Sequence, residues 1–117
     1  MITGVNLVQA LDEAIEATEE AIRETRKLAI KRAEAERDYR IAKRKRVLHE
    51  RDYNSTPATL VNDVVKGYRD IADLKFALDC AEAEWEASRE SILFHKRLTD
   101  TIREQIKREW TQAGEQF

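Results

Sequence analysis

A seven-residue repeat between Ile71 and Ala113 constrains this chain more than any other feature of its sequence. Mostly apolar residues recur there at alternating spacings of three and four. With Ile71 at position a, the a positions are Ile71, Leu78, Trp85, Ile92, Thr99, Ile106 and Ala113, and the d positions are Leu74, Ala81, Ser88, His95, Ile102 and Glu109. This spacing keeps one helical face turned toward a partner, so it favours a left-handed coiled-coil seam over an ordinary globular helix.

A second apolar stripe lies on the side of this segment opposite the seam, at positions c, f and g. Because each residue of an α-helix turns by about 100°, these positions point away from positions a and d. A helix that is apolar on two opposed sides needs two partners, of which one is the rest of this chain. We expect the other to be a second copy, with a dimer favoured and a trimer next. The candidate interface residues are Phe76, Ala83, Ala87, Phe94 and Leu98.

The first half of the chain has the composition of one long helix. From about residue 6 to residue 53 it holds no Gly and no Pro, and it is rich in residues that favour helix. Mostly small residues recur at every seventh position, and they are Leu7, Ala14, Ala21, Leu28, Ala35 and Ala42. We therefore expect this helix to pack closely against the larger side chains of the heptad seam.

A tip segment, residues 54–67, separates the two halves, and it begins with the break Asn54-Ser55-Thr56-Pro57. Thr56 is expected to cap a short helix whose first residue is Pro57. Gly67 is expected to end that helix in the left-handed conformation that favours Gly. The apolar residues expected to fold the short helix over the end of the hairpin are Leu60, Val64 and Val65.

The second long helix is expected from about residue 68 to residue 112, with Gly114 as its stop. Two helices of equal length joined by a compact connector fold back on each other. We therefore predict one all-α domain over residues 1–117. It is a coiled-coil-like antiparallel hairpin with a short helix at its tip, and it assembles into a multi-helix bundle.

The distribution of charge supports the antiparallel arrangement. The charged residues within 12–24 are all acidic except Arg23, whereas residues 26–46 hold ten basic side chains. If the numbers of facing residues add to about 118–120, each block faces a region of opposite charge on the second helix. Exposed ion pairs contribute only about 0–1 kcal/mol each, so we expect the charges to select the register more than to stabilise the fold.

The composition excludes several classes of protein. The formal net charge of −2 is unlike that of dedicated nucleic-acid-binding domains, which are basic. Cys80 is the only cysteine, which favours a reducing compartment. No secretory signal is apparent, and no apolar run approaches the roughly 20 residues of a membrane span. We expect a cytoplasmic protein with no membrane partner.

The sequence shows no pattern of catalytic chemistry. It has no Gly-rich phosphate loop, and neither His49 nor His95 follows a Glu at the spacing of a di-iron motif. We expect no metal site, no cofactor and no enzymatic activity. His95, at a d position, is expected to be a polar core residue that helps to fix the register.

A basic run at residues 40–46 is the clearest candidate for recognition. One interpretation is a solvated face that the acidic part of the second helix partly neutralises, and the other is a patch for an anionic partner. The candidate partner-binding or anion-binding residues at this end of the hairpin are Arg40, Lys43, Arg44, Arg46, His49, Arg51 and Tyr53.

Several short motifs are distributed over about three-fifths of the chain, from about Tyr39 to Trp110. They are Tyr39-Arg40-Ile41-Ala42, Pro57-Ala58-Thr59-Leu60-Val61, Asp63-Val64, Lys66-Gly67, Ile71-Ala72-Asp73-Leu74-Lys75, Asp79-Cys80-Ala81-Glu82 and Gln105-Ile106-Lys107-Arg108-Glu109-Trp110. In these motifs the chain resembles a group of small proteins encoded by phages and prophages of Gram-positive bacteria. The resemblance implies a bacterial host cytoplasm and a phage setting near recombination or replication functions, without supplying a mechanism. Thr56 stands where the group has a Gly.

Two classes of function remain open. The first is a non-enzymatic protein that binds a host or phage protein stoichiometrically through helix and tip surfaces, and modulates replication, recombination or host defence. The second is a binder of DNA or a nucleotide through the basic run. Exposure of that run in the folded protein discriminates between them, because an anion-binding site needs cations that have no partner within the hairpin.

Overall fold

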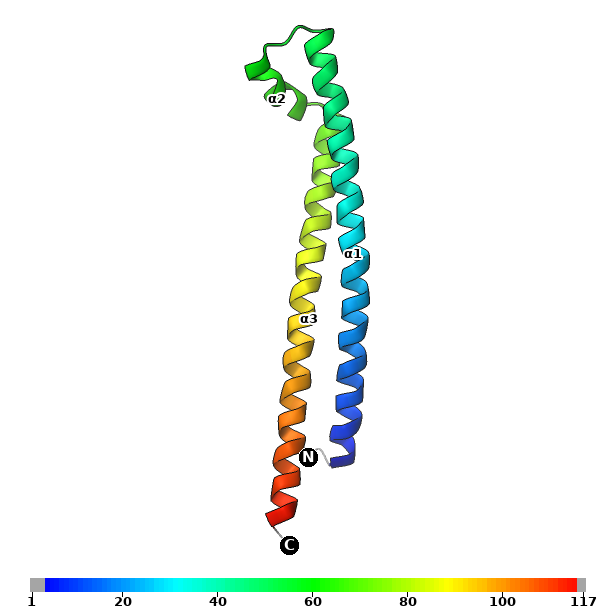
Figure 1. Cartoon of the computed structure of the whole chain (residues 1–117), viewed down its shortest axis with the longest axis vertical. Helices are drawn as coiled ribbons and strands as arrows, with labels where there is room; N and C mark the ends of the chain where they lie inside the picture. Colours follow the sequence, from blue (N-terminus) through cyan, green and yellow to red (C-terminus); the bar gives the residue numbers. More distant parts are fainter. Residues whose placement is uncertain (1–3, 116–117) are drawn as a thin grey trace. The chain divides into compact units, whose positions relative to one another are not determined.

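Three helices make up almost all of the part of the chain that the structure describes. The computed structural model describes residues 4–115 and places α1 at Gly4–Asp52, α2 at Ala58–Lys66 and α3 at Arg69–Glu115 (Figure 1). No strand occurs within these residues. The all-α prediction is confirmed, with two long helices and a short one between them.

The chain divides into two compact units, which α1 and α3 both cross. The end unit comprises residues 1–26 and 87–117, and the tip unit comprises residues 27–86 and includes α2. Within each unit α1 and α3 lie side by side and run in opposite directions (Figure 1). Each unit therefore has its own pair of antiparallel helices.

The predicted seam forms the core of both units. In the tip unit Ile71, Leu78 and Ala81 of α3 are buried, while Leu74 and Trp85 are half-buried. In the end unit Thr99 is buried, and the other a and d residues up to Glu109 are half-buried. Only Ala113, at the end of the heptad series, is exposed. The seven-residue series of α1 also faces inward, since Leu7 and Ala14 are buried and the rest are half-buried.

The register between α1 and α3 differs from the predicted one by about one helical turn. Facing residue numbers add to 113 where the hydroxyls of Thr25 and Ser88 lie 2.6 Å apart in the end unit. They add to 116 where Arg46 donates to Asp70 at 3.1 Å in the tip unit. The predicted sum of 118–120 was therefore too high. The physical reason is that α1 continues for six residues beyond Arg46, whereas α3 begins beside Asp70.

Opposite charges meet between the helices of the tip unit, as predicted. Residues 27–52 of α1 hold ten basic and five acidic side chains, and residues 69–86 of α3 hold two basic and six acidic ones. The ion pairs that join these helices are Arg32 to Glu82 at 3.1 Å, Lys31 to Glu84 at 3.3 Å and Arg46 to Asp70 at 3.1 Å. The Arg32 guanidinium also lies 5.0 Å from the Trp85 ring centroid, so Arg32 contacts a seam residue as well as Glu82.

The connector has different end residues from those predicted. Pro57, not Thr56, is the N-cap of α2, and its carbonyl oxygen accepts from the N–H groups of Leu60 and Val61. Gly67 is right-handed, with φ −82° and ψ −11°, so the predicted left-handed Gly is absent. Ser55 takes the left-handed conformation instead, with φ 55°. The second long helix, α3, is also longer than predicted, since it continues through Gly114, the predicted stop, to Glu115.

Replacing Ser55 by Gly is expected to stabilise the protein. A residue with a Cβ atom is disfavoured at positive φ, so Ser55→Gly relieves local strain that outweighs the added freedom of the unfolded chain. We expect the unfolding free energy to rise by about 0.5–1 kcal/mol, measured by urea denaturation.

The matched substitution is Gly67→Ala, at a position where a glycine has the right-handed backbone conformation that other residues prefer. A Cβ atom there would meet the Val64 carbonyl oxygen at 3.4 Å, an ordinary contact, in a right-handed conformation that Ala adopts readily. We expect Gly67→Ala to be neutral or stabilising. A large loss with Gly67→Ala, or with Ser55→Gly, would contradict this account of the connector.

His95 is a polar residue within the seam of the end unit. Its Nδ1 atom is buried and has no hydrogen-bond partner among residues 6–114. Its ring packs edge-on against Phe94, with centroids 5.5 Å apart. An unsatisfied buried polar atom destabilises a fold, so the histidine lowers stability at this position.

A leucine at position 95 should restore the apolar seam. His95→Leu is expected to raise the unfolding free energy by about 1 kcal/mol, because it removes the unsatisfied nitrogen and keeps a d-position side chain of similar size. His49→Leu, at an exposed site of α1, is the control and should change stability little. Equal effects at the two sites would show that burial of Nδ1 is unimportant.

Candidate interaction site

A buried carboxylate in the last turn of α1 holds the tip together. Glu50 is 3% exposed. Its Oε1 accepts from Asn54 Nδ2 at 3.0 Å and from the Tyr68 hydroxyl, and its Oε2 accepts from Thr56 Oγ1 at 2.7 Å. The Glu50 carbonyl oxygen also accepts from the Thr56 N–H at 3.0 Å. One side chain therefore joins the end of α1, the turn before α2 and the residue before α3.

An apolar cluster fastens α2 beside these contacts. Val61 and Val65 of α2 are buried together with Ile71 of α3. The partly buried residues packed against them are Tyr39, Ala42, Val47 and Tyr68. Since α2 packs against both long helices, its position in the tip unit is set by core packing as well as by the Glu50 contacts.

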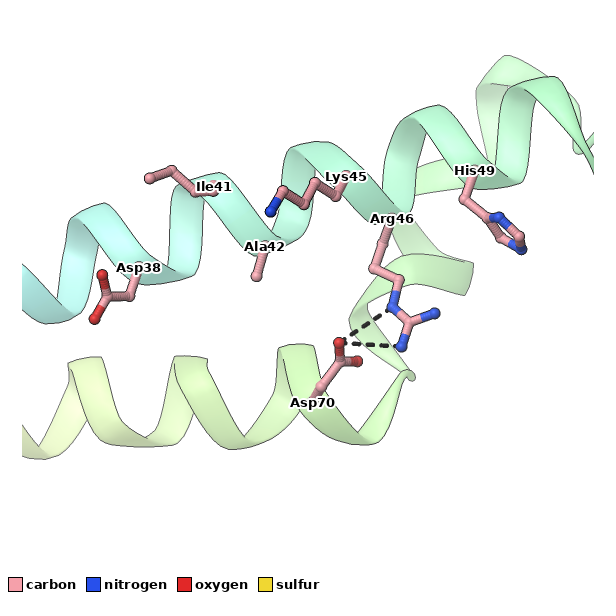
Figure 2. Close-up of a pocket in the computed structure, with 7 residues that line it drawn as sticks. All are labelled: Asp38, Ile41, Ala42, Lys45, Arg46, His49 and Asp70. Carbon is pink, nitrogen blue, oxygen red and sulfur yellow. Dashed lines mark hydrogen bonds and ion pairs between the residues drawn. The ribbon is translucent and has the colours of Figure 1, made fainter.

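Tyr68 links the Glu50 contacts to an ion pair. The Arg46 guanidinium lies 4.6 Å from the Tyr68 ring centroid and donates to Asp70 at 3.1 Å. Figure 2 shows Arg46 reaching from α1 to Asp70 of α3. A stacked and paired guanidinium has fewer donors left for an external anion.

The seven predicted site residues all belong to the tip unit, but they differ in availability. Arg40 pairs with Glu36 at 2.8 Å, Lys43 lies 5.8 Å from the Tyr39 ring centroid, and Arg46 is engaged as described above. Arg44 and Arg51 are exposed and make no ion pair within the part of the chain that the structure describes. The same holds for Lys45, which is therefore a better candidate than Lys43.

His49 and Tyr53 form an exposed aromatic pair. Their ring centroids are 5.1 Å apart with an interplanar angle of 30°. Tyr53 is 80% exposed, so most of its ring is open to a partner. Stacking on His49 limits the motion of this ring, which lowers the entropy lost when a partner binds it.

A shallow groove of about 460 Å³ lies on one side of α1 in the tip unit. Its lining residues are Asp38, Ile41, Ala42, Lys45, Arg46, His49 and Asp70 (Figure 2). Asp38 pairs with Arg37 and Asp70 pairs with Arg46, which leaves Lys45 and His49 as the polar groups open to a ligand. Its lining combines the apolar side chains of Ile41 and Ala42 with charged and polar ones, which suits a peptide side chain better than a small anion.

The outer face of α2 carries an apolar pair that sequence reasoning assigned to the interior. Leu60 is 51% exposed and Val64 is 42% exposed. The expectation that Leu60, Val64 and Val65 cover the end of the hairpin is confirmed for Val65 but was wrong for Leu60 and Val64, because Val61 pairs with Val65 in that role. The two pairs have the same i, i+4 spacing, so hydrophobic periodicity alone could not tell which faces inward.

The five candidate interface residues of α3 are all exposed. In the tip unit these are Phe76 and Ala83, and in the end unit they are Ala87, Phe94 and Leu98. Phe76 is 71% exposed and Phe94 is 63% exposed. Their side chains are thus free for contact with another molecule, as an interface requires.

No group of three or more His, Cys, Asp or Glu residues that could hold a metal ion occurs in the described part of the chain. Cys80 is exposed and unpaired as a thiol. Lys75 has a raised pKa because Asp79 accepts its hydrogen bond, with the Asp79 charge adding to the effect. That shift keeps Lys75 protonated, which is unsuited to a nucleophile.

Comparisons with known proteins give no relative on which to base a function. No family model, no curated protein and no solved structure matches this chain. Among the residues described, no helix is both long enough and apolar enough to cross a membrane. The geometry of the tip unit therefore carries the functional argument.

Removing the charge of Glu50 is expected to weaken the tip. A Gln at this position keeps one oxygen acceptor but replaces the other with an amide N–H2 that can only donate, and it turns the charge-assisted hydrogen bonds of Glu50 into weaker neutral ones. We expect Glu50→Gln to lower the unfolding free energy by about 1–3 kcal/mol. Glu84→Gln, which removes an exposed pairing charge, should change it by less than about 0.5 kcal/mol. Similar losses for both variants would argue against a special role for Glu50.

Proposed function

We propose that this protein acts by stoichiometric binding of a protein partner through its tip unit, without turnover. The observation that supports this proposal is the exposed pair Leu60 and Val64 on α2, whose opposite face is buried in the core. Exposed aliphatic side chains favour association, because binding removes them from water. Since α2 is held in place by its buried face, little conformational entropy is lost when a partner binds.

Exposed cations elsewhere in the tip unit favour a partner whose binding surface is acidic as well as apolar. Arg44, Lys45 and Arg51 are exposed cations of the same unit that have no ion pair among its described residues. Tyr53 adds an exposed aromatic ring of the kind enriched at the centres of interfaces. Charges of this kind steer encounter and select partners more than they add affinity.

The resemblance to phage and prophage proteins supports a search for the partner in phage-infected Gram-positive bacteria. A host or phage protein of replication, recombination or host defence is the proposed class of partner, and the bacterial cytoplasm is the proposed compartment. Assembly of hairpins into a bundle, as a dimer or next as a trimer, is part of the same proposal. An assembly gathers several tips, and multivalency can raise avidity by about 10²–10⁴.

The tip proposal can be tested with a partner captured by the wild-type protein from infected cells and then purified. Leu60→Ser combined with Val64→Ser should weaken its binding by about 10–100-fold in titration calorimetry, because two apolar contacts are lost. Titration should saturate at a fixed molar ratio, with the partner recovered chemically unchanged.

Ile30→Ser is the matched control for this experiment. Ile30 is an aliphatic residue of the same unit that is also largely exposed, but it lies on α1 away from the connector. Its replacement should leave the affinity unchanged, and circular dichroism should show that helicity persists in all variants. Unchanged affinity after loss of Leu60 and Val64 would move the binding site to another surface.

An anionic ligand, DNA or a nucleotide, is the second candidate. The unpaired cations Arg44, Lys45 and Arg51 are the observation in its favour. Pairing of Arg40 with Glu36, and of Arg46 with Asp70, leaves less positive charge available than the sequence alone suggests. A fluorescence titration with labelled DNA at several salt concentrations separates the candidates, since DNA binding weakens steeply with salt.

A further inference from the structure

The end unit carries a short apolar stripe on α3 whose spacing reads the same in both directions. Its members are Ala87, Ser91, Phe94 and Leu98, at spacings of four, three and four. Phe94 and Leu98 are exposed, Ala87 is exposed and Ser91 is half-buried. Residues at this spacing share one side of a helix, so they offer a continuous contact surface.

A symmetric spacing fits a two-fold contact between identical helices. When two copies of the stripe run antiparallel, Ala87 lies opposite Leu98 of the second copy, and Ser91 lies opposite Phe94 of the second copy. Each contact then joins a small residue to a large one, which allows the helices to interdigitate without voids. An isologous contact repeats every such pair twice, as two-fold dimers require.

The charges beside the stripe select the antiparallel arrangement. Glu90 and Arg97 are seven residues apart on the outer flank of the stripe, and both are exposed. Neither makes an ion pair with a residue that the structure describes. An antiparallel contact brings each Glu90 beside Arg97 of the second copy. A parallel contact would instead place the Glu90 and Arg97 flanks of the two copies on opposite edges of the contact, where these charges could not pair.

We infer that the occupant of this surface is a second copy of the chain, docked antiparallel through α3 of the end unit. The inference rests on the self-assembly proposed above and specifies its contact. Burial of Phe94 and Leu98 provides most of the free energy of association. The reciprocal Glu90 to Arg97 pairs select the antiparallel orientation of the two helices.

Sedimentation equilibrium over a range of concentrations tests this contact. The wild-type protein should reach twice the 13.6 kDa mass of the chain. Phe94→Asp should weaken the dimer at least about 100-fold, because it places two charges in the apolar centre of the contact. Val8→Asp, at another exposed aliphatic residue of the same unit, is the control and should leave the dimer unchanged.

A charge exchange tests the direction of the helices. Glu90→Arg alone and Arg97→Glu alone should each weaken the dimer about tenfold, since each creates like-charge contacts twice. The double variant, Glu90→Arg with Arg97→Glu, should recover the wild-type dissociation constant. Failure of the double variant to recover would overturn the antiparallel arrangement.

The remaining outcomes separate this contact from the broader proposal. A monomer at all concentrations would overturn both this contact and self-assembly. A stable dimer that is insensitive to Phe94→Asp would overturn only the contact. A trimer would also overturn it, because a two-fold contact closes after two copies. Circular dichroism on each variant shows whether helicity is retained, so that loss of association can be told from loss of folding.

Discussion

The buried carboxylate of Glu50 is the interaction on which the tip unit depends. A carboxylate loses a large hydration energy when it leaves water, and only several hydrogen bonds can offset that loss. Asn54, Thr56 and Tyr68 supply those bonds from three successive parts of the connector. The connector can therefore adopt few conformations without leaving the charge unsatisfied. This constraint explains how a segment with only nine helical residues holds a defined position.

The register of the long helices in the tip unit follows from the same constraint. Because α2 packs beside the last turns of α1, the chain enters α3 level with Arg46 and not beyond the end of α1. The Arg46 to Asp70 pair and its stacking on Tyr68 then lie next to the Glu50 contacts. Charge complementarity alone would accept a shift of one turn, since acidic residues recur along α3. The hydrogen bonds of the connector remove that freedom.

The helices could be predicted from sequence because their signals are local. The apolar residues of the seam repeat with a fixed period. The residues on either side of 54–57 favour helix over any other secondary structure. Orientation of α2 could not be predicted, because Leu60 with Val64 and Val61 with Val65 are equally apolar pairs. Ser55 was overlooked at the left-handed position because Gly67 carried the stronger local signal. Availability of the basic residues depended on partners that the sequence reasoning did not assign, namely Glu36 within α1 for Arg40 and Asp70 of α3 for Arg46.

The distribution of side-chain sizes is the physical basis of the proposed self-association. Alanines of α1 occupy the seam, whereas Phe76 of the tip unit and Phe94 of the end unit point into water. Full burial of one large apolar side chain contributes about 1.5–3 kcal/mol, so a hairpin optimised as a monomer would place its Phe residues in the seam. A seam that is lined on the α1 side mostly by alanine, with two phenylalanines left outside it, makes a thin core that cannot supply much stability by itself. Such an arrangement becomes favourable when the outer faces are covered, which is the physical reason to expect that folding and association of this chain are coupled.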